Sequence, residues 1–192
     1  MRDQEAASIT VRDSRDDDLP TIAEIYAHHV THGFGSFEET PPGIEELRRR
    51  RTEIRAKGLP YLVASEGSVG PILGYAYASP YRTRSAYRFS IEDSIYVAPG
   101  AARRGIGRML LTALIERATA LGYRQMVAVI GDSGNLGSIG LHRALGFAQV
   151  GKLPSIGFKM GRWIDGILMQ RALGQGDSTA PVERRRQIHA EP

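Results

Sequence analysis

The sequence of 192 residues lacks cysteine entirely and contains no long hydrophobic run. Without cysteine the chain can form no disulfide, no thiolate site for zinc or an iron–sulfur cluster, and no cysteine nucleophile. A membrane-spanning helix needs about 18 consecutive apolar residues, whereas runs such as 126–130 have the length of a strand. The first ten residues also lack the basic and apolar segments of a signal peptide. We therefore expect a cytoplasmic protein that does not interact with a membrane.

An excess of one charge is also nearly absent, because 25 basic residues face 21 acidic ones and the net charge is +4. This small excess favours an anionic ligand but is weak support for binding nucleic acid. Glycine, in contrast, is abundant: the chain has 22 glycines, whereas an average protein contains roughly 7%. The abundance indicates tight turns or a backbone that approaches a ligand closely.

Hydrophobic periodicity predicts one α/β domain over residues 8–173. Residues 1–7 are predicted to be disordered, and residues 174–192 contain so few apolar residues that we expect a disordered tail there as well. Strands are expected at 9–11, 61–65, 72–79, 89–97 and 125–130, with two or three more between 147 and 173. Helices are expected at 19–30, 44–57, 103–121 and 135–145.

Two of these strands are expected to form the centre of the sheet. Strand 125–130 is continuously apolar, which indicates burial on both faces, and the helix that precedes it predicts a parallel crossover pair with strand 89–97. Strand 89–97 alternates, with Asp93 on one face and Glu92, Ser94 and Tyr96 on the other. A carboxylate such as Glu92 in an apolar strand is either a solvated or salt-bridged side chain or a functional one.

Residues 103–108 read Arg-Arg-Gly-Ile-Gly-Arg and open the helix that follows strand 89–97. The free N–H groups of such a turn and the helix dipole favour an anion, above all a pyrophosphate. A glycine-rich turn without a ligand is the simpler alternative. A dinucleotide fingerprint is excluded because Leu110 stands where its last glycine or alanine belongs, and the lysine of a P-loop is missing.

These motifs resemble those of the GCN5-related N-acetyltransferase (GNAT) family. Residues 103–108 fit its R-R-x-G-x-G motif, and residues 135–147 fit its N-x-x-[AS]-x-x-L-Y-x-x-L-G-F segment, with His142 in place of the tyrosine. Residues 34–38, 91–97 (IEDSIYV), 126–131 (MVAVIG) and 157–163 (GFKMGRW) resemble the phosphinothricin and methionine sulfoximine acetyltransferases of that family. The resemblance covers about residues 8–173.

The resemblance implies an α/β GNAT fold, in which helices flank a mixed sheet that splays between its two parallel core strands. It also implies acetyl-CoA as co-substrate, with its pantetheine arm between those strands, and no metal. The N–H of Val97 would polarise the thioester carbonyl. The residues implied to bind acetyl-CoA are Ile95, Tyr96, Val97, Arg103, Arg104, Gly105, Ile106, Gly107, Arg108, Asn135 and Ser138.

The same resemblance implies that Glu92 is the catalytic base and that His142 is catalytic. The tyrosine that most relatives carry in place of His142 can donate a proton to the sulfur of the coenzyme. A histidine can donate or accept a proton near neutral pH, so its role as acid or base stays open. From the residues alone, a half-buried helix histidine and a glutamate in a salt bridge are the alternatives.

The acceptor pocket implied by the resemblance takes a small molecule that is similar to an amino acid. Arginine suits such an acceptor because it binds both oxygens of a carboxylate or phosphinate at once. The residues expected to contact the acceptor are Phe37, Glu38, Tyr75, Arg82, Thr83, Arg84, Glu92, Asp93 and Ser94.

Three other features have simple structural explanations. His28 and His32 are four residues apart, a spacing that could bind a metal, but the sequence offers no third ligand nearby. Arginines 48–51 are expected on a solvated helix face. Trp163, the single tryptophan, is expected in the core or in a homodimer interface, because the sheet edge after residue 147 needs covering.

The sequence therefore predicts an acetyl-CoA-dependent N-acetyltransferase that modifies the amino group of a small amino-acid-like substrate of the phosphinothricin, methionine sulfoximine or methionine sulfone type. Acetylation of a peptide or protein N-terminus is the alternative within the same class. A nucleic-acid-binding module, suggested by the arginines at 48–51 and 184–186, is the alternative of a different class. No aromatic residues interleave those arginines, which argues against nucleic acid as a partner.

Overall fold

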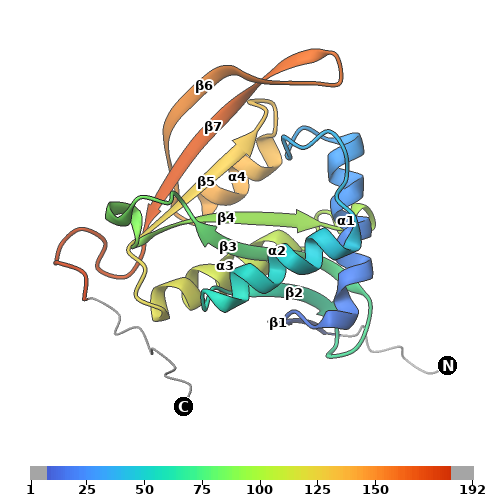
Figure 1. Ribbon diagram of the computed structural model, residues 1–192, viewed down its shortest axis with the longest axis horizontal. Helices are drawn as coiled ribbons and strands as arrows, with labels where there is room; N and C mark the ends of the chain where they lie inside the picture. Colours follow the sequence, from blue (N-terminus) through green and yellow to red (C-terminus); the bar gives the residue numbers. More distant parts are fainter. Residues whose placement is uncertain (1–7, 183–192) are drawn as a thin grey trace.

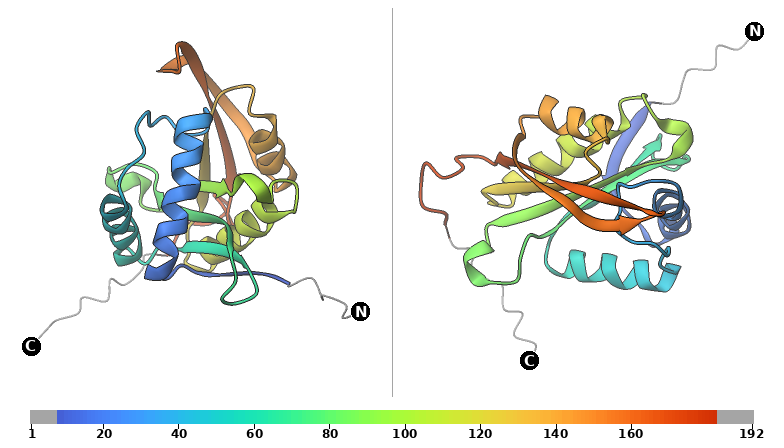
Figure 2. Two further views of the ribbon diagram at one scale, coloured as in Figure 1. Left: turned by 90° about the vertical axis from the view of Figure 1, so that its right-hand side faces the viewer. Right: turned by 90° about the horizontal axis from the view of Figure 1, so that it is seen from above.

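The computed structural model describes residues 8–182, which form a seven-stranded sheet with helices on both faces (Figures 1 and 2). The strand order is β1-β2-β3-β4-β5-β7-β6. The strands are β1 (Ile9–Asp13), β2 (Tyr61–Glu66), β3 (Ile72–Pro80), β4 (Ser90–Val97), β5 (Gln125–Gly131), β6 (Ala148–Lys159) and β7 (Arg162–Ala172). The α-helices are α1 (Leu19–His32), α2 (Ile44–Ala56), α3 (Ile106–Ala120) and α4 (Leu136–Ala144). The expected α/β class with a mixed sheet is confirmed.

β4 and β5 form a parallel pair that diverges after a short stretch. Pairing runs from Ser90 opposite Gln125 to Asp93 opposite Ala128. Beyond Asp93, β4 continues beside β3, whereas β5 continues beside β7. The predicted parallel pair and its splay are therefore confirmed. Because a strand that loses a neighbour leaves a row of N–H and C=O groups without strand partners, the splay creates a place where a ligand can bind backbone.

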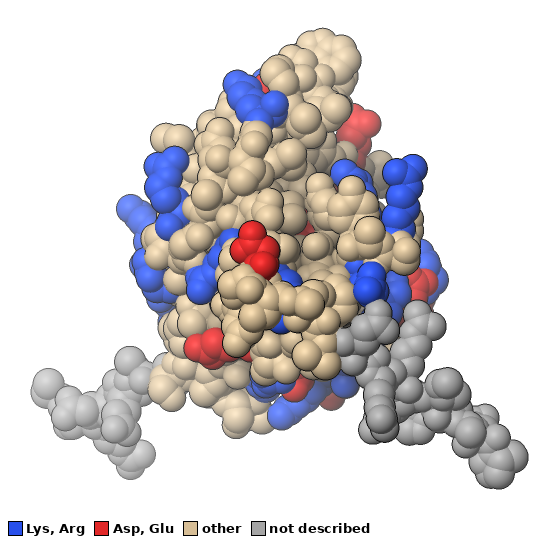
Figure 3. Space-filling view, turned by 90° about the vertical axis from the view of Figure 1, so that its left-hand side faces the viewer, with Lys and Arg blue, Asp and Glu red and all other residues tan. Residues whose placement is uncertain are grey.

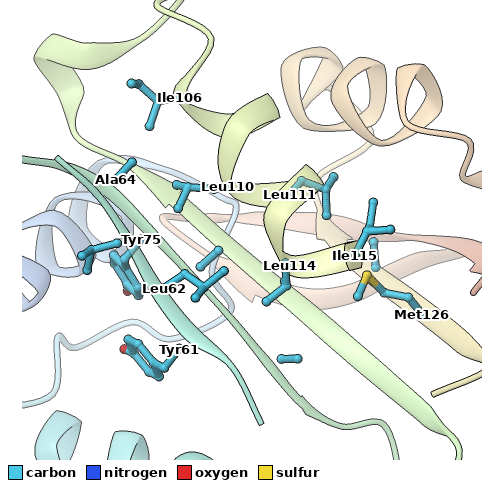
Figure 4. Packing of buried hydrophobic residues seen from close by; sticks show 14 of the residues in the cluster. Tyr61, Leu62, Ala64, Tyr75, Ile106, Leu110, Leu111, Leu114, Ile115 and Met126 are labelled. Carbon is cyan, nitrogen blue, oxygen red and sulfur yellow. The ribbon is translucent and has the colours of Figure 1, made fainter. Parts of the chain in front are cut away.

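Helices α1 and α2 cover one face of the sheet, and α3 and α4 cover the other (Figure 2). Leu110, Leu111, Leu114 and Ile115 recur at helical spacing in α3 and are buried against the sheet (Figure 4). Burying one such side chain contributes about 1.5–3 kcal/mol, so this packing fixes the start of α3 beside the end of β4. Within residues 8–182, no helix has the length and hydrophobicity needed to cross a bilayer.

β6 and β7 form a long hairpin that projects from the rest of the molecule (Figure 1). Two strands thus occupy the segment for which the sequence predicts two or three, and Gly161, with a φ of 75°, lies in the turn between them. β7 pairs with β5, which leaves β6 as the edge of the sheet. The expectation of a sheet edge after residue 147 is confirmed.

The segment that follows β7 contacts the domain as far as it is described. Arg124 donates to the carbonyl oxygen of Gly176 at 3.1 Å, to Thr179 Oγ1 at 3.0 Å and to the carbonyl oxygen of Ala180 at 3.2 Å. These bonds attach residues 176–180 to the start of β5, within the segment for which the sequence predicts a disordered tail; the boundary of that tail stays a prediction. Composition misses them because they need few apolar side chains. Residues 1–7 and 183–192, including arginines 184–186, lie outside the described residues.

Arginines 48–51 of α2 are engaged by acidic residues. Arg51 is only 2% exposed and donates to Ser14 Oγ, to the Ser14 carbonyl oxygen and to Asp16 Oδ1. The expectation of a solvated face is wrong for Arg51, because helical spacing places it on the buried side of α2. The remaining pairs are Arg48 with Asp16 and Glu45, Arg49 with Glu46 and Glu53, and Arg50 with Glu38 and Glu46.

Candidate active site

A cleft of about 930 Å³ opens where β4 and β5 diverge. Its walls come from α1, β4, the turn before α3, β5 and α4, and from the loop after α1. Both predicted catalytic residues, Glu92 and His142, line it. Of the residues predicted to bind acetyl-CoA, Arg104 alone does not line this cleft. Folding therefore brings the separate sequence motifs together at one place.

The backbone of β4 presents alternate residues to the cleft. The Ala98 N–H donates to the Leu73 carbonyl oxygen at 2.9 Å. Because backbone groups alternate in an antiparallel ladder, those of Tyr96 also face β3, and those of Ile95 and Val97 face the side that β5 has left. Ile95 and Val97 are among the residues that the family resemblance implies to bind acetyl-CoA.

The glycine-rich turn forms a left-handed entry into α3. Arg103 and Gly105 have φ values of 64° and 81°, and α3 begins at Ile106, three residues later than expected. A left-handed residue cannot continue a right-handed helix, which explains the later start. The first N–H groups of a helix have no intrahelical partners. The residues that carry these N–H groups at the start of α3 line the cleft, which is the arrangement that an anion site requires.

Three residues of the predicted coenzyme site have structural partners. Asn135 Oδ1 accepts from the Ser138 N–H at 3.2 Å and caps α4, a common role for asparagine. Both residues still line the cleft. Arg104 is directed away, and its Nη2 donates to Glu66 Oε1 at 2.8 Å. A direct role of Arg104 in the cleft is therefore not supported.

Glu92 lies in the cleft wall on β4 and is half-buried. Burial raises the pKa of its carboxyl group, the neighbouring charge of Asp93 raises the pKa further, and Arg82 lowers it in part. A raised pKa brings a carboxylate closer to the range in which it can accept a proton from an amine or from water. The position and the electrostatics of Glu92 fit a general base.

His142 is buried in the wall of the cleft, 3% exposed, and is hydrogen-bonded through both nitrogens. Its Nε2 lies 3.0 Å from Asp93 Oδ2, and its Nδ1 lies 2.8 Å from the carbonyl oxygen of Ser138. Burial lowers the pKa of His142, but the hydrogen bond and charge of Asp93 outweigh burial, so the pKa is raised. Asp93, which the sequence predicts to contact the acceptor, lines the cleft and is hydrogen-bonded to His142; contact with the acceptor stays a prediction.

The residues expected around the acceptor separate into two groups. Phe37, Glu38 and Ser94 line the cleft together with Glu92. Residues 82–84 are exposed in the connection between β3 and β4 and do not line it, and Arg82 is related to the cleft through its charge effect on Glu92. Tyr75 is 1% exposed and lines a separate cavity of about 260 Å³.

The sequence did not point to three residues that line the cleft. His29 Nε2 lies 2.8 Å from the carbonyl oxygen of Val97, so α1 supports the end of β4 after the splay. Tyr26 Oη lies 3.0 Å from Ser36 Oγ and connects α1 to the following loop. Tyr77, on β3, lies opposite Ser94 of β4. Helical spacing marks Tyr26 only as a core residue, and nothing local distinguishes His29 from the adjacent His28.

His28 and His32 stack on each other with ring centroids 4.6 Å apart. No group of three or more histidine, aspartate or glutamate side chains within residues 8–182 is arranged to hold a metal ion. His28 and His32 therefore form a stacked pair on α1.

Comparison with known proteins gives relatives that match nearly the whole domain. The profile of the acetyltransferase (GNAT) family matches residues 22–147. A phosphinothricin N-acetyltransferase from Alcaligenes faecalis is 58% identical over 172 residues, which is 90% of this chain and 86% of the relative. An L-methionine sulfoximine/L-methionine sulfone acetyltransferase from Pseudomonas paraeruginosa is 43% identical over 164 residues, covering 85% of this chain and 94% of the relative.

A solved structure agrees with these relatives. The crystal structure of a GNAT superfamily phosphinothricin acetyltransferase from Sinorhizobium meliloti in complex with acetyl-CoA is 50% identical, with a TM-score of 0.87, and the match covers 91% of this chain and 94% of that one. The chain belongs to the acetyltransferase (GNAT) family. It is an N-acetyltransferase with acetyl-CoA as co-substrate, as the sequence motifs predict.

Proposed function

We propose that this enzyme acetylates the α-amino group of a small acidic amino-acid analogue, of the phosphinothricin, methionine sulfoximine or methionine sulfone type. The single observation that carries the proposal is the position of Glu92. This carboxylate lies in the same cleft, and on the same strand, as the backbone groups of Ile95 and Val97 that face the side left by β5. The names and high identities of the relatives support the choice of acceptor.

The reaction needs a neutral amine, because an ammonium group has no lone pair with which to attack a carbonyl carbon. Glu92 accepts the proton of the ammonium group, directly or through water. The amine then attacks the thioester carbonyl, a C–N bond forms and the C–S bond breaks. The Val97 N–H stabilises the negative charge that develops on the carbonyl oxygen. After the attack the nitrogen loses a second proton, and the thiolate of coenzyme A leaves and is protonated. Glu92 then releases the first proton to solvent, so the reaction yields the amide, the coenzyme A thiol and one proton.

The acidic group of the acceptor is proposed to meet Arg82 and Arg84 at the entrance on the side of Glu92. Arg82 is near enough to lower the pKa of Glu92 by its charge. Both guanidinium groups are exposed and can turn toward a carboxylate or phosphinate. Phe37 and Glu38 border the same part of the cleft and are proposed to contact the acceptor.

Initial rates with acetyl-CoA and a panel of acceptors test the proposal. The panel contains phosphinothricin, methionine sulfoximine, methionine sulfone, the proteinogenic amino acids and a peptide with a free N-terminus. We expect the highest kcat/KM with the three analogues. Preference for the peptide would instead favour the alternative acetyltransferase function.

The nucleic-acid alternative has little support on the face of the molecule shown in Figure 3. There, lysine and arginine side chains are spread around the margin and do not gather into one patch. Arginines 48–51 of α2 are also held in ion pairs. A rise in melting temperature with coenzyme A, and none with DNA, is the expected outcome of a thermal-shift assay.

We propose that the protein forms a homodimer through the β6–β7 hairpin. Six large apolar residues of this hairpin are exposed, and Trp163 among them is 63% exposed. A surface of this kind is typical of a contact with another molecule, and a second copy provides a matching apolar surface. The six residues are Val150, Leu153, Ile156, Phe158, Met160 and Trp163.

The mass in solution at micromolar concentration, measured by light scattering, tests the dimer. We expect twice the chain mass for the wild type and a monomer for Trp163→Glu. Val69→Glu serves as the matched control, because Val69 is also exposed and apolar but lies between β2 and β3. A monomeric wild type contradicts the proposal.

The cytoplasm is the proposed location, since acetyl-CoA is available there and the chain has no cysteine that would need an oxidising compartment. Resistance to an inhibitor that resembles an amino acid is the proposed biological outcome, because acetylation removes the positive charge of its amino group. Growth of an expressing strain on phosphinothricin, compared with a strain that carries Glu92→Gln, tests this outcome.

A further inference from the structure

Asp93 and His142 form a buried pair at the point where β4 and β5 diverge. The side chains of His142 and Asp93 are 4% and 2% exposed. Asp93 is the last residue of β4 that pairs with β5. The His142 ring contacts the Phe147 ring nearly perpendicularly, which limits how far the imidazole can turn. The pair is therefore a fixed part of the wall of the cleft.

The oxygen atom nearest to each nitrogen of His142 can only accept a hydrogen bond, whereas the Ser138 hydroxyl, which can also donate, lies farther from Nδ1, at 3.4 Å. The Ser138 carbonyl oxygen lies 2.8 Å from Nδ1, and the Asp93 carboxylate lies 3.0 Å from Nε2. A neutral imidazole has one N–H group and satisfies one of these oxygens, whereas an imidazolium has two and satisfies both. The hydrogen-bond geometry thus selects the charged form of the ring.

The charge of Asp93 also requires a partner. Its second oxygen, Oδ1, is buried and has no hydrogen-bond partner within residues 8–182. His142 is therefore the group that compensates this carboxylate. A buried carboxylate beside a neutral partner is costly, whereas an imidazolium makes the pair neutral overall.

No other charged group among the described residues competes for the ring. β5 carries no titratable side chain. The β6 residues Lys152 and Lys159 are bound elsewhere, to Asp165 and to the carbonyl oxygen of Ser36. Arg143 on α4 itself does not contribute to the shift in the pKa of His142, which comes from burial, Asp93 and the Ser138 carbonyl.

We propose that Asp93 is a positioning residue that holds His142 as an imidazolium, so that neither ring nitrogen has a free lone pair and His142 cannot act as a general base. This inference rests on the proposed function, and it decides between the two roles that the sequence leaves open for His142. Proton removal from the acceptor is then left to Glu92.

Nuclear magnetic resonance of ¹⁵N-labelled histidine in the free enzyme tests the charge directly and needs no substrate. His142→Gln identifies the signals of His142 among those of the chain's histidines. We expect a titration midpoint above that of an ordinary histidine, with both nitrogens protonated below that midpoint. A midpoint at or below that of an ordinary histidine overturns the proposal, whatever acceptor the enzyme uses.

Asp93→Asn keeps the size of the side chain and an oxygen that can accept from Nε2, but it removes the charge. Loss of an opposite charge at this distance lowers the titration midpoint of His142 by about 1–3 pH units. Glu116→Gln removes a negative charge from the exposed face of α3 and is the matched control, with no shift expected. An unchanged midpoint in Asp93→Asn contradicts the proposal.

The kinetics of the double variant show whether Asp93 acts through His142. If it does, Asp93→Asn adds little to the loss of kcat already caused by His142→Gln, because effects within one unit are not additive. Independent, multiplied losses would mean that Asp93 contacts the acceptor, as the sequence predicts. Inactivity of the wild type toward every amino-acid acceptor refutes the proposed function but leaves the titration result intact.

Discussion

The proposed coenzyme half and the proposed acceptor half of the cleft are built in different ways. The coenzyme half is almost continuous in sequence: the end of β4, the glycine-rich turn and the start of α3 span residues 95–108, and α4 adds Asn135 and Ser138. The acceptor half combines a loop after α1, the middle of β3 and the early part of β4. A short motif can therefore identify the first half but not the second.

The loop of the acceptor half is held by the C-terminal hairpin. Lys159 Nζ donates to the Ser36 carbonyl oxygen at 2.8 Å, and burial lowers the pKa of this lysine. Gly157 lies so close to Phe37 that a Cβ at position 157 would approach ring atoms at 2.6 Å. Residues more than a hundred positions apart thus determine where Phe37 and Glu38 stand. The acceptor half depends on the tertiary fold, whereas the coenzyme half depends mostly on local backbone conformation.

Glu92→Gln is expected to have the largest effect, because it removes the proposed base at the junction of the two halves. General acid–base groups contribute about 10²- to 10⁴-fold, so we expect kcat to fall by about that factor while the dissociation constant of acetyl-CoA hardly changes. Steady-state kinetics and calorimetry measure the two quantities. A raised KM with kcat preserved would instead mean that Glu92 anchors the substrate ammonium group.

Gly105→Val tests whether the coenzyme half depends on local backbone. A Cβ at Gly105 meets no atom within 4 Å, so the cost arises from its φ of 81° and not from a clash within the protein. A left-handed conformation costs an ordinary residue about 1–2 kcal/mol, which corresponds to about a five- to thirtyfold weaker affinity for acetyl-CoA. Calorimetry measures the affinity.

Gly105→Asn is the matched control for this prediction, since asparagine tolerates the left-handed region better than valine. Its loss of affinity is expected to be clearly smaller. Equal losses in the two variants would mean that the side chain obstructs the coenzyme directly. Unchanged binding in Gly105→Val would place the pyrophosphate elsewhere.

Arg82→Met is expected to have the smallest effect on catalysis and to act on the acceptor half alone. Arg82 lowers the pKa of Glu92, so its removal raises that pKa. Activity falls as pH drops through the pKa of a base, and the acidic limb of the kcat/KM profile therefore moves to higher pH. Because Arg82 is exposed, we expect a shift of less than about one pH unit.

Arg55→Met removes the same charge from an exposed position on α2 and should leave the profile unchanged. If both variants shift the acidic limb equally, the effect comes from net charge and Arg82 has no particular relation to Glu92. A rise in KM for phosphinothricin in Arg82→Met, with the KM for acetyl-CoA unchanged, would further support contact with the acceptor.

Most of the fold could be predicted because periodicity and turn residues report on local structure. The alternation in β4, the continuous apolar run in β5 and the amphipathic α3 gave the parallel pair and its crossover. The same local information failed for Arg51. Its charged side chain is buried and donates three hydrogen bonds to Ser14 and Asp16, near the start of the chain. Nor does it indicate the hydrogen bonds from Arg124 to Gly176 and Thr179.

The sequence by itself determined the class of enzyme, the coenzyme turn and the positions of Glu92 and His142, because their motifs are contiguous and the chemistry of each residue type is limited. Only the tertiary structure decided what surrounds them. It placed the Asp93 carboxylate against His142, brought His29 to Val97 and positioned Tyr75 in the wall of a separate cavity. These outcomes depend on how strands and helices pack, since a side chain meets partners that its neighbours in sequence do not specify.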